Sequence, residues 1–281
     1  VGIMKLVETG LDLLNLVPVY ERAKPILHAL PEVSEASVHP GEIQGDIEVS
    51  NLGFSYGEGA QILKDVSFVA RPGEFIALVG PSGSGKSTML RLLLGFEKPT
   101  SGAIYYDKQD IMDLDLNALR RQFGVVLQSG KLMPVDIFNN IVGSANYSLE
   151  DAWEAARLVG LDKDIEGMPM GMHTVISDGA RTFSGGQRQR IMIARAIIHR
   201  PRVLFFDEAT SALDNNSQAI VTSSLSNLKS TRIVIAHRLS TVIKADRIIV
   251  LQDGHIVQNG SYKELIAVPG LFQDLATRQI A

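Results

Sequence analysis

Gly80-Pro81-Ser82-Gly83-Ser84-Gly85-Lys86-Ser87 is the stretch that decides the fold of this chain. An apolar run at residues 75–79 precedes it and a helical pattern at 88–94 follows it, so the order is strand, glycine-rich turn, helix. Glycines let successive backbone N–H groups curl round an anion, and the positive end of the following helix points at the same place. Because both flanking elements are present, we predict a phosphate-binding loop and not a turn that merely changes the direction of the chain.

The residue types of this loop have separate roles in binding a nucleoside triphosphate. Lys86 would reach the β- and γ-phosphates, and the Ser87 hydroxyl would ligate Mg²⁺. The nucleotide-binding residues expected here are Gly80, Pro81, Ser82, Gly83, Ser84, Gly85, Lys86, Ser87 and Thr88.

Composition limits the classes of protein to which the chain can belong. With 281 residues, of which 45% are hydrophobic and 21% charged, we expect one large domain, or a domain with a subdomain, that folds in water. The net charge of −4 leaves no excess of positive charge for binding phosphate backbones, which argues against nucleic acid as the main partner. The absence of cysteine excludes disulfides and thiolate metal sites, and it fits a reducing compartment. No apolar run approaches the ~20 residues that span a bilayer, and the first residues lack a signal-peptide layout.

The first 45 residues differ in pattern from the rest. Leucine and valine recur through residues 6–19 and prolines follow at 25 and 31, so we predict a short amphipathic helix broken by proline. Residues 32–45 are poor in large apolar side chains and contain Pro40-Gly41, which predicts a linker. This part is either an extension that packs on the core or the tail of a segment that leads in from upstream.

From Asp46 onward the pattern predicts strands. Residues 47–49 and 52–56 alternate, a glycine-rich turn follows, and residues 62–70 form a second strand, which predicts an antiparallel hairpin ahead of the phosphate-binding loop. Tyr56 lies at the end of its strand. Its ring would either stack on a base or pack in the core or at the edge of the sheet.

Polar residues follow the other predicted buried strands. Gln128 ends the strand at 124–128, Asp207 and Glu208 follow the strand at 201–206, and His237 follows the strand at 232–236. Ligands of open α/β sheets bind beyond the carboxyl ends of the strands, so we expect these side chains beside the phosphates. Of the two acids, one would hold Mg²⁺ and the other would polarise water, because neighbouring strand residues point to opposite sides.

The segment from 129 to about 182 is helical and rich in loops, with Ser148 as the N-cap of one helix. Ser184-Gly185-Gly186-Gln187 then opens a further helix, and a polar, glycine-rich helix start predicts a second anion site. One triphosphate does not obviously need two such sites in one chain.

Turn and cap signals complete the pattern near the C-terminus. Asp253-Gly254 predicts a type I′ hairpin, and Ser261 with Glu264 predicts a capping box. The elements together predict an α/β fold with a P-loop NTPase core and a mostly parallel sheet. An N-terminal antiparallel β subdomain and an inserted α-helical subdomain at about 129–190 would complete a domain spanning 46–281.

The sequence from Asp46 to its end resembles the nucleotide-binding domain of ATP-binding cassette (ABC) transporters, because several motifs occur in the order of that family. The resemblance implies that Tyr56 stacks on adenine, that residues 80–87 are Walker A and that residues 211–214 are the D-loop. Ser184, Gly185, Gly186 and Gln187 would be the signature that contacts nucleotide. The catalytic residues would be Glu208, His237, Gln128 and Lys86, the metal ligands Ser87, Gln128 and Asp207, and the bound ligands ATP and Mg²⁺.

The same resemblance implies partners. In this family the signature of one subunit closes over the γ-phosphate held by the P-loop of the other, which implies ATP-dependent, head-to-tail pairing with a second copy. Residues 236–241 and the N-terminal extension resemble exporters, in which a transmembrane domain precedes this domain on one polypeptide. Residues 1–45 would lead in from that domain, at the cytoplasmic face of the cell membrane. Residues 20–25 and 132–134 most resemble exporters associated with bacteriocin-type modified peptides, which implies a peptide substrate.

Two departures from the family pattern and two alternative functions remain. Phe183 stands where the signature usually has leucine, which is tolerated if the side chain packs, and Asp178 is the acidic residue of an altered Val-Gly-Glu-x-Gly segment. A non-transport ABC ATPase of DNA repair or translation would need a coiled-coil insertion, a cysteine zinc site or tandem cassettes, which the sequence lacks. A nucleotide sensor that does not hydrolyse is disfavoured because Glu208, Gln128 and His237 are present.

Overall fold

The computed structural model describes residues 2–28, 37–177, 183–210, 212–236 and 238–280. Contacts divide the chain into two compact units, Val1–Ser37 and Val38–Ala281, which are described separately. The sequence predicted a boundary at 45/46 instead. Residues 38–45 belong with the second unit because Val38 forms a β-bridge with Leu114 and Ile43 is fully buried.

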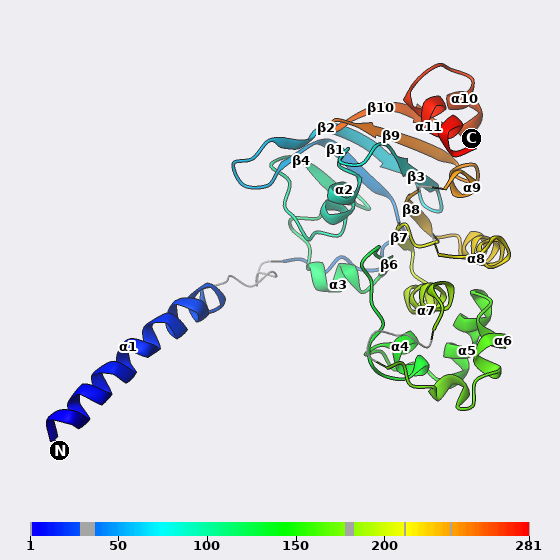
Figure 1. Cartoon of the computed structure of the whole chain (residues 1–281). Coiled ribbons are helices and arrows are strands. Elements are labelled where there is room, and N and C mark those ends of the chain that lie inside the picture. The colour runs from blue at the N-terminus through cyan, green and yellow to red at the C-terminus, as the bar shows by residue number, and fades with distance from the viewer. Residues whose placement is uncertain (1, 29–36, 178–182, 211, 237, 281) are drawn as a thin grey trace. The chain divides into compact units, whose positions relative to one another are not determined.

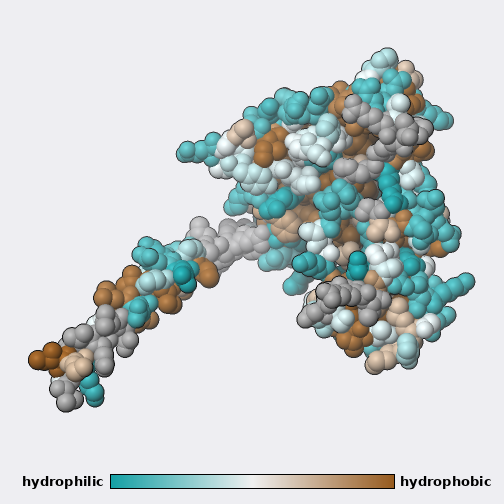
Figure 2. Space-filling model, viewed as in Figure 1, coloured by the Kyte–Doolittle hydropathy of each residue, from teal (hydrophilic) through white to brown (hydrophobic). Residues whose placement is uncertain are grey.

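The first unit is a single helix, α1 (Gly2–Leu27), with Pro18 and Pro25 inside it. The prediction of a short helix broken by proline was wrong. Each proline removes one backbone donor, and the helix continues because the neighbouring residues keep their bonds. Apolar side chains lie on the surface of α1 (Figure 2), among them Ile3, Met4, Leu14, Leu16, Val17, Val19, Tyr20, Ile26 and Leu27. Among the described helices, none has both the length and the apolar composition needed to cross a bilayer.

The second unit begins with an antiparallel sheet of four strands in the order β2-β1-β4-β5. Strand β1 (Ile47–Ser55) pairs with β2 (Gln61–Ala70), as the hairpin pattern predicted, and also with β4 (Ser101–Tyr106). The short strand β5 (Gln109–Asp110) closes the sheet.

A second sheet has six strands in the order β10-β9-β3-β8-β7-β6. Four of the five strand pairs in this sheet are parallel, and the pair formed by β9 and β10 is antiparallel. The strands are β3 (Phe75–Val79), β6 (Phe123–Val126), β7 (Val203–Asp207), β8 (Thr231–Ile235), β9 (Arg247–Gln252) and β10 (His255–Gly260). Asp253 and Gly254 between β9 and β10 have φ of 49° and 85°, which confirms the predicted tight hairpin.

Helices cover both faces of the six-stranded sheet, and Figure 1 shows α4, α5, α6 and α7 grouped on the side away from β1, β2 and β4. The helices of this unit are α2 (Lys86–Leu93), α3 (Leu116–Arg120), α4 (Ile137–Val142), α5 (Leu149–Leu158), α6 (Asp162–Glu166), α7 (Gly185–Ile197), α8 (Asn215–Asn227), α9 (Leu239–Val242), α10 (Tyr262–Ile266) and α11 (Leu271–Ile280), with a 3₁₀ turn at Gly171–His173. The predicted N-cap at Ser148, which opens α5, and the predicted capping box at Ser261, which opens α10, are both present, and Ser148 forms a capping box as well.

Strand alternation gives the unit two cores. Ile76 and Leu78 of β3 point into a core shared with the antiparallel sheet and α2, whereas Phe75, Ala77 and Val79 point into a core shared with helices of the α4–α8 region. The predicted fold class, with a mostly parallel sheet, an antiparallel β subdomain and an α-helical subdomain, is therefore confirmed.

One buried hydrogen bond joins the antiparallel sheet to the end of α2, and it yields a stability prediction. The Tyr106 hydroxyl, on a fully buried ring, donates to the Leu93 carbonyl at 2.6 Å. Tyr106→Phe leaves that carbonyl without a partner, so it should lower the free energy of unfolding by about 1–3 kcal/mol. Urea titration followed by circular dichroism measures the loss. The control is Tyr105→Phe at the preceding, half-buried position of β4, which should change stability by less than about 0.5 kcal/mol. Equal effects of the two variants would contradict the role of the Leu93 bond.

Candidate functional site

The candidate site lies where the parallel strands β3, β8, β7 and β6 end. The glycine-rich loop follows Val79 at the end of β3, Glu208 follows Asp207 at the end of β7, and Gln128 lies two residues beyond β6. Strand β8 lies between β3 and β7, so the glycine-rich loop and Glu208 follow strands that are two positions apart in the sheet. The sequence thus brings segments more than a hundred residues apart to one edge of the sheet.

Glycine is required at particular positions of the loop for different reasons. At Gly80, with φ of 149°, an added Cβ would collide with the carbonyl oxygen of Leu251. At Gly85, with φ of 101°, it would lie 2.7 Å from the Leu63 side chain. At Gly83, with φ of 80°, nothing lies within 4 Å, so only the backbone conformation demands glycine and the surrounding space is open.

Lys86 is folded over the loop that precedes it. Its Nζ donates to the carbonyl oxygens of Gly80 and Pro81, both at 2.8 Å, and lies 3.5 Å from the Ser84 hydroxyl. The side chain is buried, and burial lowers the pKa of Lys86, while the negative charges of Asp207 and Glu208 raise it. Burying the positive charge of Lys86 costs free energy, and a bound anion offsets that cost. The Lys86 ammonium is therefore suited to binding an anion.

The N-terminus of α2 lacks the side-chain cap that most helices of this unit have, as do the starts of α6 and α9. Its N-cap is Gly85 in the left-handed conformation, and no side chain caps it. Side chains of Asp115, Asp136, Ser148, Ser184, Asp214 and Ser261 cap α3, α4, α5, α7, α8 and α10. The positive end of α2, the loop with open space at Gly83 and the Lys86 ammonium together fit a phosphate group.

The two acids at the end of β7 differ in burial and in backbone conformation. Asp207 is the last residue of β7 and is buried, whereas Glu208 is half-buried and has φ of 53°, in the left-handed region. Ser87 and Gln128 are exposed at the same edge. The described residues contain no group of three or more His, Cys, Asp or Glu side chains that would hold a metal ion by itself. Ser87, Gln128 and Asp207 supply oxygen donors, and phosphate and water would complete the coordination of Mg²⁺. This arrangement suits Mg²⁺, which is usually bound by a few protein oxygens, phosphate and water, and not by protein ligands alone.

The predicted second anion site opens α7. The Ser184 hydroxyl accepts from the Gln187 N–H at 3.1 Å, and the Gln187 Oε1 accepts from the Ser184 N–H at 3.0 Å, which forms a capping box. The Gln187 amide also donates to Asp164 on α6 at 2.8 Å. Ser184 and Gln187 are therefore engaged within the chain, while Gly185 and Gly186 lie between them at the helix start. Phe183 is buried in the core, as its position before the signature predicted.

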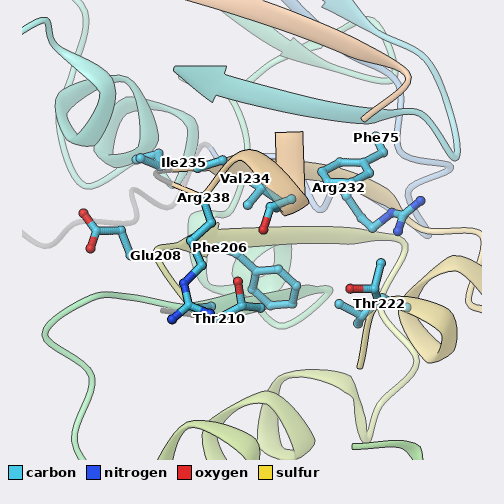
Figure 3. A pocket seen from close by; sticks show the side chains of 13 residues that line it. Phe75, Phe206, Glu208, Thr210, Thr222, Arg232, Val234, Ile235 and Arg238 are labelled. Carbon is cyan, nitrogen blue, oxygen red and sulfur yellow. The ribbon is translucent and has the colours of Figure 1, made fainter. Parts of the chain in front are cut away.

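A small apolar cavity lies beside the acidic pair (Figure 3). It has a volume of ≈ 40 Å³ and is lined by side chains that include Phe75, Phe206 and Val234. A cavity of about 150 Å³ accommodates benzene, so this smaller one cannot accommodate a nucleotide. The Glu208 carboxylate points away from Phe206 and Thr222, out of the cavity.

Two further predicted residues have different outcomes. Tyr56 follows the end of β1 and is 45% exposed, and its ring makes an edge-on contact with Phe54 at 4.8 Å between centroids. Its ring is thus available to a base and is not part of the core. His237 lies outside the described residues, as do Ser211 of the predicted D-loop and Asp178 of the segment before the signature.

Sequence reasoning missed three polar residues that hold the site together. Gln189 on α7 contacts the backbone of Glu208 and Ala212, Arg238 donates to the Leu213 carbonyl at 2.8 Å, and Asp164 pairs with both Gln187 and Arg190. The available sequence signal was the position of Gln189 four residues before Ile193, a spacing that puts this polar side chain on a buried face of α7.

Comparison with known proteins gives concordant matches. A family model described as ABC transporter matches residues 63–211, more than half of the chain. The chain is 47% identical over 230 residues to the alpha-hemolysin translocation ATP-binding protein HlyB of Escherichia coli O157:H7, covering 80% of this chain and 33% of that protein. It is 42% identical over 235 residues to human ATP-binding cassette sub-family B member 6, covering 83% of this chain and 28% of that protein.

Among solved structures, a bacterial Atm1-family ABC exporter with ATP bound matches with a TM-score of 0.89 and 34% identity. The match covers 95% of this chain and 47% of that chain. The chain thus spans about a third of the length of the curated relatives described above.

The position of Lys86 predicts its effect on binding a triphosphate. Lys86→Ala removes a buried positive charge that faces the open loop, so the affinity for ATP should fall by about 30-fold or more, equivalent to about 2 kcal/mol. Isothermal titration calorimetry measures the dissociation constant. Arg91→Ala is the control, because Arg91 is a cation on the same helix that pairs with Glu97 on the surface. Unchanged affinity in Lys86→Ala, or an equal loss in Arg91→Ala, would contradict the assignment of the loop.

The exposed ring of Tyr56 predicts weak selectivity for the base. Stacking on a base contributes about 1–3 kcal/mol, so Tyr56→Ala should weaken ATP binding by about 5- to 100-fold, and GTP should compete with ATP. Tyr56→Phe keeps the ring and should bind ATP as the unmodified chain does. If Tyr56→Ala bound ATP with unchanged affinity, the ring would have a structural role only.

Proposed function

The chain belongs to the ABC transporter family and carries its ATPase domain, and from this premise we propose that it binds ATP with Mg²⁺, hydrolyses the ATP and thereby drives an exporter. The observation that carries the proposal is the convergence of the uncapped α2 start, Lys86 and Glu208 at one edge of the sheet. These groups supply positive potential for phosphates and, next to it, a carboxylate that can orient water.

In the proposed mechanism each residue acts at a stated atom. The backbone N–H groups of the loop and Lys86 Nζ hold the phosphate oxygens, and the Glu208 carboxylate accepts a hydrogen bond from the attacking water. Gln128 and His237 would position the γ-phosphate and that water. When bound, Mg²⁺ neutralises charge on the phosphates, and Ser87, Gln128 and Asp207 are the residues proposed to hold it.

We further propose that two copies pair head to tail around two ATP molecules. One chain carries two glycine-rich helix starts, at α2 and α7, and a single triphosphate occupies only one of them. Pairing places residues 184–187 of one copy over the phosphates held by the loop of the other. The pair is then held together largely through its ligands, so it should depend on ATP.

The proposed second partner is a transmembrane domain on the same polypeptide, which would place this domain at the cytoplasmic face of the cell membrane. Supporting this, the relatives are about three times as long as the matched part, and α1 carries exposed apolar side chains suited to packing beside membrane-spanning helices. A peptide or protein substrate, of the bacteriocin type or similar, is supported by residues 20–25 and 132–134 and by the name of the E. coli relative, which translocates alpha-hemolysin.

Hydrolysis and pairing are tested together with Glu208→Gln. This change keeps the shape of the side chain but removes the charge that orients water, so phosphate release should fall by about 100-fold or more while ATP stays bound. The paired form should then accumulate with ATP and be absent without it, as measured by size-exclusion chromatography with light scattering. A nucleotide sensor without hydrolysis predicts instead that the unmodified chain releases no phosphate.

The shared-site arrangement is tested by adding Gly185→Asp to Glu208→Gln. The new carboxylate would meet the γ-phosphate of the partner's nucleotide and prevent pairing by repulsion of like charges. Glu208→Gln with Gly185→Ala is the steric control, because an added Cβ lies 3.4 Å from the Ala212 Cβ, which is close to an ordinary contact. Pairing should survive in the alanine variant. Equal pairing with aspartate, or no pairing of Glu208→Gln at saturating ATP, would rule out the shared site.

A further inference from the structure

We infer that Gln189 is a positioning residue that ties the start of α7 to the backbone of Glu208, and so links the half of the site that serves a second nucleotide to the half that serves the first. The inference rests on the proposed function, because it assigns α7 and Glu208 to two different nucleotides. It concerns the reaction geometry and adds no ligand to the site.

The contacts of Gln189 are directed at both ends of one loop. Its Nε2 donates to the Glu208 carbonyl oxygen at 3.1 Å, and its Oε1 accepts from the Ala212 N–H at 2.8 Å. The side chain is 8% exposed, so water competes little for either bond. Gln189 therefore clamps the segment that begins with the proposed catalytic residue and ends before the N-cap of α8.

Glu208 needs such a clamp because of its backbone conformation. Its φ of 53° lies in the left-handed region, which costs a non-glycine residue about 1–3 kcal/mol and persists only where the surrounding structure enforces it. Its N–H is held by the Ile235 carbonyl at 3.2 Å, and its C=O is held by Gln189. With both peptide groups fixed, the direction of the Glu208 side chain depends on β8 on one side and on α7 on the other.

The start of α7 also packs directly on the clamped loop. An added Cβ at Gly186 would lie 3.2 Å from the Ala212 carbonyl oxygen, and one at Gly185 would lie 3.4 Å from the Ala212 Cβ. From the other side, Arg238 donates to the Leu213 carbonyl at 2.8 Å. A shift of α7 when a second nucleotide docks on residues 184–187 would therefore reach Ala212 by contact and Glu208 through Gln189.

This link makes hydrolysis depend on closure of the pair. In a single copy the Gln189 bonds are already present, but no partner nucleotide holds the first turn of α7, so any displacement of α7 also displaces the backbone of Glu208. After closure α7 is fixed by the partner's nucleotide, and Gln189 transmits that constraint to Glu208. A misplacement of about 1 Å costs up to about 100-fold in rate, so a single clamp is sufficient to couple the two events.

The test compares Gln189→Met with the unmodified chain. Methionine keeps the length of the side chain but removes its hydrogen bonds to Glu208 and Ala212, so kcat for ATP hydrolysis should fall roughly 10- to 100-fold. KM should change less than about twofold, because no group that touches ATP is altered. In the Glu208→Gln background, Gln189→Met should still pair with ATP, which shows that binding and closure survive.

Two further variants separate positioning from structural support. Gln189→Glu keeps the acceptor for the Ala212 N–H but removes the donor to the Glu208 carbonyl, so its kcat should fall as far as that of Gln189→Met. Gln122→Met is the matched control: the Gln122 Oε1 accepts from the Ile43 N–H at 2.9 Å, and its Nε2 donates to the Gly41 carbonyl at 2.6 Å, which is the same two-bond pattern away from the site. That variant should lower the melting temperature and leave kcat unchanged.

Each result decides the inference. If the unmodified chain releases no phosphate, both the proposed function and the inference are wrong. If the unmodified chain is active and Gln189→Met has the same kcat, only the inference fails. It is also overturned if Gln189→Glu keeps full activity, if Gln189→Met no longer pairs in the Glu208→Gln background, or if Gln122→Met loses kcat to the same extent.

Discussion

The parallel hydrogen-bond ladder of β3, β8, β7 and β6 is the constraint on which the site depends. Its register pairs Leu78 with Ile235 and Asp207 with Ile235, so three strands end level with one another and their following loops meet. A slip of one residue in β7 would turn Phe205 and Phe206 to the opposite cores, which their burial forbids. Packing of the two apolar cores thus fixes where Glu208 leaves the sheet, and the chemistry of the edge follows from that position.

The parts of the fold and site that the sequence predicted are those set by local pattern. The apolar strand, the glycines of residues 80–85 and the helix that begins at Lys86 are encoded by neighbouring residues, because positive φ and helix starts depend on short-range sterics and bonds. The hairpin at Asp253-Gly254 was predictable for the same reason. The positions of Gln128 beyond β6 and of Asp207 and Glu208 at the end of β7 were predictable because a parallel sheet gathers the carboxyl ends of its strands.

The remaining features depend on tertiary contacts that a linear pattern does not contain. Gln189 meets Glu208 and Ala212 only once α7 lies along the loop after β7, and Asp164 meets Gln187 only once α6 packs beside α7. The boundary at residue 45 was drawn on composition, yet the Ile43 side chain is buried in the core and its N–H donates to Gln122, 79 positions along the chain. Proline also disrupts the first helix less than the sequence analysis predicted, since Pro18 removes a single backbone donor and α1 continues through it.

The two glycine-rich helix starts offer different numbers of free donors and different charge to a phosphate, which implies an order of binding. At α2 no side chain competes for the first-turn N–H groups, and Lys86 adds a full positive charge. At α7 the capping box already satisfies the N–H groups of Ser184 and Gln187, which leaves the donors of Gly185 and Gly186 for a ligand. An isolated copy should therefore bind a triphosphate first at α2, where more donors and more charge are available. The weaker start at α7 then contributes only to a phosphate that another copy already holds, and pairing becomes a consequence of nucleotide binding instead of a precondition for it.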